Sequence, residues 1–169
     1  MGAEVPNPAP KVKGRSGVRF FLQAALASGF FTGYFPFAPA TVTSLFTLIP
    51  AYFLSRNPLI AAVVIIGLFF LGVWLADDLE KVWGKDPARV TIDEIVGTLL
   101  TFFLIPVSFL GIGVGFVLWR GFDIIKLPFI NRVQNVRGGW GVMLDDLLSG
   151  ICANLVLRLL VFLLPILGG

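Results

Sequence analysis

The amino-acid sequence predicts an all-α integral membrane protein, a bundle of about five transmembrane helices with an N-terminal interfacial or re-entrant helix. Three observations lead to this fold class. Hydrophobic residues make up 57% of the 169 residues and charged residues only 14%, whereas soluble domains carry about 25% charged residues. The mean hydropathy is +0.91. Apolar runs of membrane-spanning length follow one another along most of the chain.

The composition also excludes several classes of function. The chain has no histidine, which rules out histidine-nucleophile phosphatases, Ser-His-Asp hydrolases and histidine zinc sites. Its single cysteine, Cys152, excludes an internal disulfide. The net charge of +3 comes from scattered basic residues, so no nucleic-acid footprint is expected.

The N-terminal half should contain a short surface helix and two spans. Residues 1–17 are polar, with three prolines and three basic residues, and predict a flexible cytoplasmic arm. Residues 18–169 should then form one transmembrane helical catalytic domain. Helix breakers fill the middle of the uncharged stretch 20–55. We expect a helix over about 19–31, a loop over 32–39 and a span over about 41–54. A single kinked helix is the alternative.

The next elements are separated by charge and proline. A turn at 55–58 leads into an uncharged span over 59–76, and a charged loop is expected over 77–90, with room for a helical turn at 78–83. The stretch 95–119 could be one span of 25 residues. The alternative is a hairpin turning at Pro106, with helices over about 89–105 and 108–125. The last helix is expected over about 142–164.

The distribution of basic residues favours the hairpin. With a turn at Pro106, the N-terminal arm, the loop 77–90 and the loop 124–141 all lie on one side of the membrane. The loops of the opposite side then contain only Arg56, a strong positive-inside pattern. The basic residues gathered on the first side are Lys11, Lys13, Arg15, Arg19, Lys81, Lys85, Arg89, Arg120, Lys126, Arg132 and Arg137.

The hairpin also brings five carboxylates to the cytoplasmic boundary. Asp93 and Glu94 lie at the entry of one helix, Asp123 lies at the exit of the next, and a glycine turn leads to Asp145 and Asp146. Carboxylates this close repel one another unless a cation joins them. Mg²⁺ is the expected cation because it prefers oxygen ligands and is commonly shared with substrate phosphate.

Basic residues accompany these acids. Arg120, Asp123 and Lys126 are spaced i, i+3, i+6, so on a helix they share one face. Arginine and lysine could bind phosphate oxygens there. Each group also has a plainer interpretation. The acidic pairs could cap helix N-termini, and Arg120 could extend to lipid headgroups. Asp77, Asp78 and Glu80 are expected to form a solvated face.

Four sequence blocks over about residues 30–152 carry the most specific motifs. They read Pro36-Phe-Ala-Pro-Ala-Thr-Val-Thr-Ser44-Leu45, Asp93-Glu94-Ile-Val-Gly97, Arg120-x-x-Asp123-x-x-Lys126 and Asn135-Val-Arg-Gly138-Gly139-Trp-Gly141-Val-Met143-Leu-Asp145-Asp146-x-x-x-Gly150. Together they resemble the phosphatidylglycerophosphatase A family of bacterial lipid phosphatases. The corresponding family patterns include P-x-x-P-G-T-x-G-S-L, D-E-x-V-G and N-V-x-G-G-x-G-I-M-x-D-D-x-x-A-G. Ala40 and Thr43 stand where the family usually has glycines, and Leu127-Pro128-Phe129 replaces its P-x-P.

The resemblance implies Mg²⁺-dependent hydrolysis of the terminal phosphate of phosphatidylglycerophosphate, giving phosphatidylglycerol and inorganic phosphate at the bacterial inner membrane. The implied catalytic residues are Asp93, Glu94, Asp123, Asp145 and Asp146, of which the last four would be metal ligands. Arg120, Lys126, Thr41 and Ser44 would bind the substrate phosphate. The nucleophile is a water or an aspartate, and the absence of a D-x-D sequence favours water. A membrane cation transporter with an acidic ion site is the alternative function.

Overall fold

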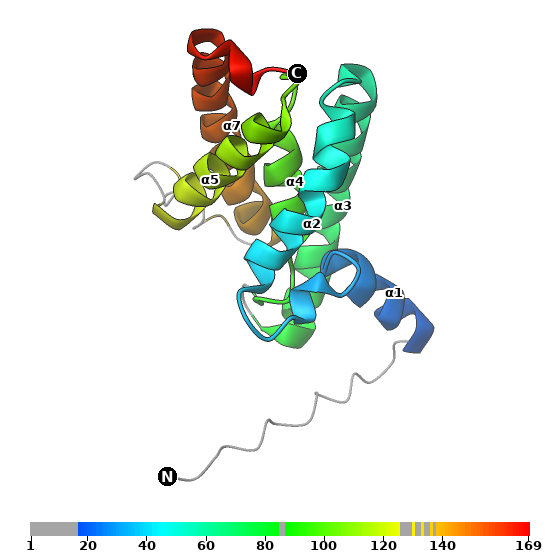
Figure 1. Cartoon of the computed structure of the whole chain (residues 1–169). Helices are drawn as coiled ribbons and strands as arrows, with labels where there is room; N and C mark the ends of the chain where they lie inside the picture. Colours follow the sequence, from blue (N-terminus) through cyan, green and yellow to red (C-terminus); the bar gives the residue numbers. More distant parts are fainter. Residues whose placement is uncertain (1–16, 85–86, 126–129, 131–132, 134–135, 137) are drawn as a thin grey trace.

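The computed structural model describes residues 17–84, 87–125, 130, 133, 136 and 138–169. Within these residues the chain is helical, and the only β pairing is an isolated antiparallel bridge between Val107 and Gly168 (Figure 1). The all-α class is therefore confirmed. The predicted flexible arm lies almost entirely outside the described residues.

The helices form a bundle around a short central helix. The α-helices are α1 (Gly17–Ala27), α2 (Pro39–Leu54), α3 (Pro58–Trp83), α4 (Ile92–Thr101), α5 (Phe109–Ile125) and α7 (Gly139–Leu163), and the 3₁₀ helices are η1 (Thr32–Tyr34) and η2 (Pro165–Leu167). Among the described helices, α3 and α7 are long and apolar enough to cross a membrane. Large apolar side chains are exposed along α2, α3, α5 and α7, which indicates a membrane protein.

The N-terminal segment contains a separate short helix, so the single kinked helix over 20–55 is wrong. α1 ends at Ala27, and Phe30, Phe31 and Ala38 adopt positive φ angles that interrupt the chain before α2. Gln23 on α1 donates a hydrogen bond from Nε2 to Asp78 Oδ2 at 2.9 Å. The backbone N–H of Thr91 donates to the carbonyl of Ala27 at 2.8 Å. These bonds attach α1 to one end of the bundle.

Helix α3 continues into the predicted charged loop, which is a correction to the expected end near residue 76. The helix runs to Trp83, and its final turns carry an i,i+4 ion pair between Lys81 and Asp77 at 3.3 Å. Trp83 also packs edge-on against Phe20 of α1. Charge at these positions therefore marks an extension of the helix rather than a loop. Asp77 is exposed as expected, but the Asp78 side chain, which accepts the hydrogen bond from Gln23, is only 18% exposed, and Glu80 is half-buried.

The chain turns back between α4 and α5, which confirms the hairpin and excludes one continuous span over 95–119. Helix α4, however, has only ten residues, about 15 Å, and is shorter than the predicted 89–105. Seven of these residues are buried. Asn154 of α7 donates from Nδ2 to the carbonyls of Leu100, Thr101 and Phe103. This capping from another helix explains why α4 ends inside the bundle.

Helix α7 packs closely against the other helices through glycines. It begins at Gly139, three residues before the predicted start, directly after Gly138 with φ +69°. A Cβ on Gly72 of α3 would overlap Met143 of α7. A Cβ on Gly150 of α7 would lie 2.7 Å from the carbonyl oxygen of Gly97 of α4. The glycines thus permit close helix crossings and bring α7 against α4.

Candidate metal and phosphate site

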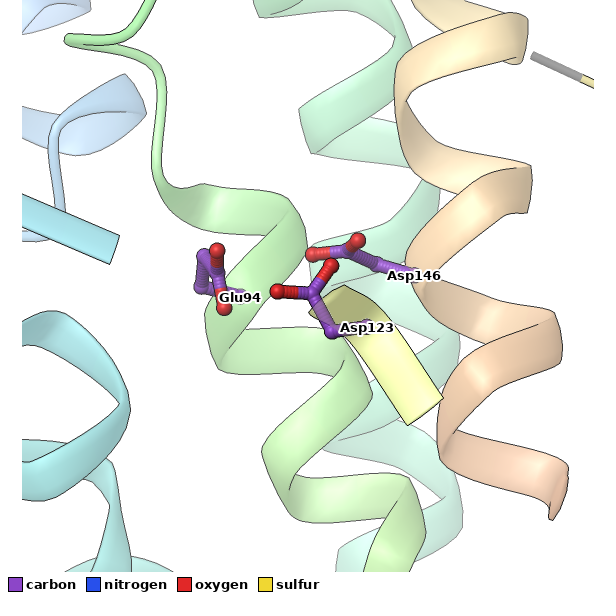
Figure 2. A group of neighbouring side chains, drawn as sticks. All are labelled: Glu94, Asp123 and Asp146. Carbon is purple, nitrogen blue, oxygen red and sulfur yellow. The ribbon is translucent and has the colours of Figure 1, made fainter. Parts of the chain in front are cut away.

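Three carboxylates from three helices meet in the bundle. Glu94 lies in the first turn of α4, Asp123 near the end of α5, and Asp146 on α7 (Figure 2). Each offers one oxygen, and the three oxygens lie within 4.8 Å of one another. The residues are 7%, 9% and 5% exposed, respectively. Helices separated in sequence by the α4–α5 turn and by residues 126–138 therefore build one buried acidic cluster.

Arg120 binds two of these carboxylates. Its Nη1 donates a hydrogen bond to Glu94 Oε2 at 2.7 Å and forms an ion pair with Asp123 Oδ2 at 2.9 Å. The side chain is mostly buried, so the interpretation that Arg120 extends to lipid headgroups is wrong. Its Nε–H is also buried and has no hydrogen-bond partner among the described residues. Arg120 therefore has one donor available for a further acceptor in the site.

A second chain of hydrogen bonds reaches Glu94 from α2 and α5. The hydroxyl of Ser44 on α2 donates to Glu94 Oε2 at 3.0 Å. The indole Nε1 of Trp119 on α5 donates to Ser44 Oγ at 3.2 Å. Both Ser44 and Trp119 are fully buried. Glu94 Oε2 thus accepts hydrogen bonds from both Ser44 and Arg120.

The charges of the cluster are suited to a divalent cation. Asp93 and Asp145 lie within electrostatic range of Asp146, together with Glu94 and Asp123. In the described part of the chain, Arg120 pairs with two of these carboxylates, Glu94 and Asp123. Asp146 Oδ2 is buried without a hydrogen-bond partner in the described part of the chain. A buried cluster of carboxylate oxygens from three helices matches the ligand preference of Mg²⁺.

The remaining predicted site residues lie around this centre. Asp93 is half-buried, and its Oδ1 accepts the backbone N–H of Glu94 at 2.9 Å, so it serves the first turn of α4. Asp145 is buried beside Asp146 but does not belong to the three-oxygen group. Thr41 is half-buried in the first turn of α2. Lys126 lies outside the described residues.

The structure also changes the interpretation of Asp145 and Asp146. They are the seventh and eighth residues of α7, which begins at Gly139. They are therefore too far along the helix to cap its N-terminus, and that alternative is wrong. Asp93 does contact the N-terminal backbone of α4, so a role at the helix end applies to that residue.

Sequence reasoning missed Trp119 and Asn154. Trp119 lies in an apolar run and therefore reads as an ordinary membrane-facing or core residue. Its position directly before Arg120 is the signal that could have identified it. Asn154 is a polar residue in the otherwise apolar stretch between Ser149 and Arg158. A polar side chain within a span commonly makes interhelical hydrogen bonds, and this is the signal that could have identified it.

Comparison with known proteins identifies related sequences that cover this site. The sequence model of the family described as Phosphatidylglycerophosphatase A matches residues 25–161. Proteins of that name from Escherichia coli and Haemophilus influenzae are 33% and 34% identical over 131 and 137 residues. These alignments cover 75% and 78% of this chain, and 76% and 83% of the relatives.

A third relative has a different name. A Bacteroides thetaiotaomicron protein, named provisionally as a phosphatidylinositol-3-phosphatase, is 36% identical over 140 residues. The alignment covers 78% of this chain and 88% of that protein. No solved structure matches the chain significantly. The named activities of the relatives agree on a phosphate carried by a lipid and differ in the lipid headgroup.

Proposed function

Since this chain belongs to the phosphatidylglycerophosphatase A family and is a phosphatase, we propose that it hydrolyses phosphatidylglycerophosphate with Mg²⁺ as cofactor. Water adds across the terminal phosphate ester bond, so the products are phosphatidylglycerol and inorganic phosphate. The observation that carries this proposal is the buried cluster of Glu94, Asp123 and Asp146 beside Arg120. It combines oxygen ligands for a hard cation with a cation for the phosphate.

Glu94, Asp123 and Asp146 are the proposed ligands of the metal, with Asp145 beside them. Two observations support this assignment: Asp146 Oδ2 has no hydrogen-bond partner in the described part of the chain, and one oxygen of each residue lies within 4.8 Å of the other two. When bound, Mg²⁺ would neutralise charge on the phosphate and make the phosphorus more electrophilic. Asp93 holds the first turn of α4 through the Glu94 N–H and so helps to fix the Glu94 backbone.

Arg120 is the proposed phosphate-binding residue. Its Nε–H has no hydrogen-bond partner among the described residues, while its Nη1 is fixed by Glu94 and Asp123. A fixed guanidinium with a remaining donor can hydrogen-bond a phosphoryl oxygen and stabilise the charge that develops on it. Lys126 and Thr41 are proposed as additional phosphate contacts on the basis of their positions in the sequence motifs. The attacking group is proposed to be water rather than an aspartate.

The site is proposed to face the cytoplasm from a bundle of about five transmembrane helices in the bacterial inner membrane, with α1 at the interface. The support is that α1, the C-terminal end of α3 and the N-terminal end of α4 lie together at one end of the bundle. They are joined there by the hydrogen bonds Gln23–Asp78 and Thr91–Ala27. Lys81 lies at this end of α3, and Glu94 begins α4 there. The basic residue Lys81 thus lies at the end of the bundle where α4 begins with Glu94, in keeping with a cytoplasmic orientation of that end.

A phosphoinositide is the competing substrate, because one relative is named for phosphatidylinositol 3-phosphate. The transporter alternative is not favoured, because the family is one of phosphatases. The acids also form one cluster rather than a path through the bundle.

The test measures phosphate release in detergent micelles from phosphatidylglycerophosphate, phosphatidylinositol 3-phosphate and phosphatidic acid. We expect Mg²⁺-dependent release from phosphatidylglycerophosphate at the highest kcat/KM, and loss of release with excess chelator. Asp146→Asn should abolish release, whereas Asp77→Asn, which alters an exposed ion pair on α3, should retain it. Faster release from phosphatidylinositol 3-phosphate would mean that this lipid, rather than phosphatidylglycerophosphate, is the substrate. No release from folded protein with any of the three lipids would refute it.

A further inference from the structure

Trp119 belongs to the apolar helix α5, but its indole N–H makes a polar contact inside the bundle. It is fully buried, yet its indole N–H points to Ser44 of α2, 75 positions earlier in the chain. The next residue is Arg120, which binds Glu94. Adjacent residues of α5 therefore approach Glu94 by two routes, one through a guanidinium and one through the Ser44 hydroxyl.

The hydrogen bonds of Ser44 have a defined direction. An indole N–H can only donate, so Ser44 Oγ must be the acceptor in its bond to Trp119. A serine hydroxyl has one proton, and here that proton is directed to Glu94 Oε2 at 3.0 Å. The hydroxyl proton of Ser44 is therefore used within the protein. This geometry differs from the expectation that Ser44 donates to substrate phosphate.

The indole ring of Trp119 packs directly against the backbone of α4, at a position where α4 has a glycine, Gly97. A Cβ on Gly97 would lie 2.6 Å from Cζ3 and 2.7 Å from Cζ2 of the Trp119 ring. Gly97 follows Glu94 by three residues on the same short helix. The backbone of Gly97 also lies close to Gly150 of α7. The ring therefore lies against the α4 backbone one turn from the acidic cluster, where neighbouring helices restrict its movement.

We propose that Trp119 is a positioning residue, whose indole N–H orients the Ser44 hydroxyl so that Ser44 and Arg120 together hold Glu94 Oε2 and direct the carboxylate toward Asp123 and Asp146. This inference deepens the proposed function and rests on it for the role of Glu94. It explains Gly97, the last residue of the Asp93–Gly97 sequence block, because any side chain there would overlap the Trp119 ring. It also assigns Ser44 to the carboxylate rather than to the substrate.

The first test does not depend on activity. The four tryptophans give four indole N–H signals in a ¹⁵N–¹H spectrum of the ¹⁵N-labelled protein in micelles, and Trp119→Phe identifies that of Trp119. We expect Ser44→Ala to move this signal upfield and to accelerate its hydrogen exchange. Trp74→Phe, which alters a half-exposed tryptophan on α3, should leave it in place. A Trp119 signal that Ser44→Ala does not move would overturn the proposal.

The second test measures the orientation of Glu94 through the cation. Added Mg²⁺ should raise the Tm of the wild type by stabilising the folded state. For Trp119→Phe we expect about a tenfold higher Mg²⁺ concentration at half-maximal shift, because loss of a buried hydrogen bond has an effect of that order. Trp74→Phe should match the wild type. An unchanged Mg²⁺ dependence in folded Trp119→Phe would count against a positioning role.

Kinetics then separate positioning from substrate contact. Trp119→Phe and Ser44→Ala should each lower kcat about tenfold with little change in KM, and the double variant should lose no more than either alone. Additive losses, or a KM effect confined to Ser44→Ala, would place Ser44 on the substrate and overturn the proposal. An inactive wild type would refute the proposed function, while the spectrum and the Mg²⁺ shift would still decide the role of Trp119.

Discussion

The two ends of α4 both bury polar groups, but they satisfy them differently. At the C-terminal end, Asn154 Nδ2 donates to the carbonyls of Leu100, Thr101 and Phe103 at 3.1, 3.0 and 2.8 Å. At the N-terminal end, Glu94 meets two further carboxylates. There, Asp146 Oδ2 and Arg120 Nε are buried without hydrogen-bond partners among the described residues. The last carbonyls of α4 thus receive hydrogen bonds from Asn154, whereas among the described residues the acidic end retains unused donors and acceptors around Glu94.

This difference separates a structural role from a functional one. A buried polar atom without a partner costs about 1–3 kcal/mol, so the N-terminal end lowers the stability of the protein. Such groups persist where a ligand supplies the missing interactions, and active sites commonly reduce stability in this way. The bonds of Asn154 fix one end of α4, while the other end presents Glu94. The comparison predicts opposite effects of substitution at the two ends.

Asp146→Asn should have the largest effect, with activity lost by about a thousandfold and the Tm raised in the absence of Mg²⁺. The substitution removes one of several mutually repelling buried charges, but it also removes a proposed metal ligand. Thermal unfolding in micelles and phosphate release measure the two effects on the same preparation. Mg²⁺ should raise the Tm of the wild type and leave that of the variant nearly unchanged.

Asp77→Asn provides the matched control, because Asp77 is an exposed carboxylate on α3 in an ion pair with Lys81. We expect little change in its activity, its Tm or its response to Mg²⁺. If Asp146→Asn instead lowered the Tm of the metal-free protein, the acidic end of α4 would be stabilising. The contrast between the two ends would then fail.

Arg120→Lys should lower kcat about a hundredfold, a smaller loss than for Asp146→Asn. Lysine retains the positive charge but lacks the planar guanidinium that binds Glu94, Asp123 and a further acceptor at once. Phosphate release at saturating lipid and Mg²⁺ measures this loss, with circular dichroism as the folding control. Activity within about twofold of the wild type would show that Arg120 acts only as a point charge.

The sequence predicted the parts of the structure that depend on charge and polarity. The concentration of basic residues on one side favoured the hairpin, and α4 and α5 do turn back near Pro106. The hairpin placed Glu94 and Asp123 at the same end, and the structure brings both beside Asp146. These features follow from local patterns because apolar runs and charged boundaries are visible in a single sequence.

Features that depend on contacts between distant residues were missed. An apolar pattern could not show that α4 ends at Thr101, because Asn154 caps it from more than fifty residues away. The pattern could not show that Trp119 donates to Ser44, since both lie in apolar runs. α3 was expected to end where charge begins. Its ion pair and its packing against α1 extend the helix instead.

Asn154→Ala tests the C-terminal end of α4, whose carbonyls accept hydrogen bonds from Asn154, and should mainly affect stability. The carbonyls of Leu100, Thr101 and Phe103 lose the Asn154 amide as a donor, although Leu100 keeps the Phe103 N–H and Phe103 keeps Arg158. We therefore expect a loss of about 1–3 kcal/mol in the free energy of unfolding. The kcat measured well below the Tm should stay within about threefold of the wild type, because the acidic cluster lies at the opposite end. Denaturation in micelles and phosphate release provide the two measurements. A selective loss of activity without loss of stability would contradict the division between the ends.

Arg158→Gln should have the smallest effect and sharpens the assignment of this end to Asn154. Arg158 is exposed, and its Nη2 adds longer contacts to the Phe103 carbonyl at 3.3 Å and to Asn154 Oδ1 at 3.4 Å. Exposed substitutions of this kind usually change stability by less than about 0.5 kcal/mol. The same unfolding measurement should therefore rank Arg158→Gln well below Asn154→Ala, with activity unchanged. A larger loss for Arg158→Gln would mean that the charge, rather than the buried amide, holds the end of α4.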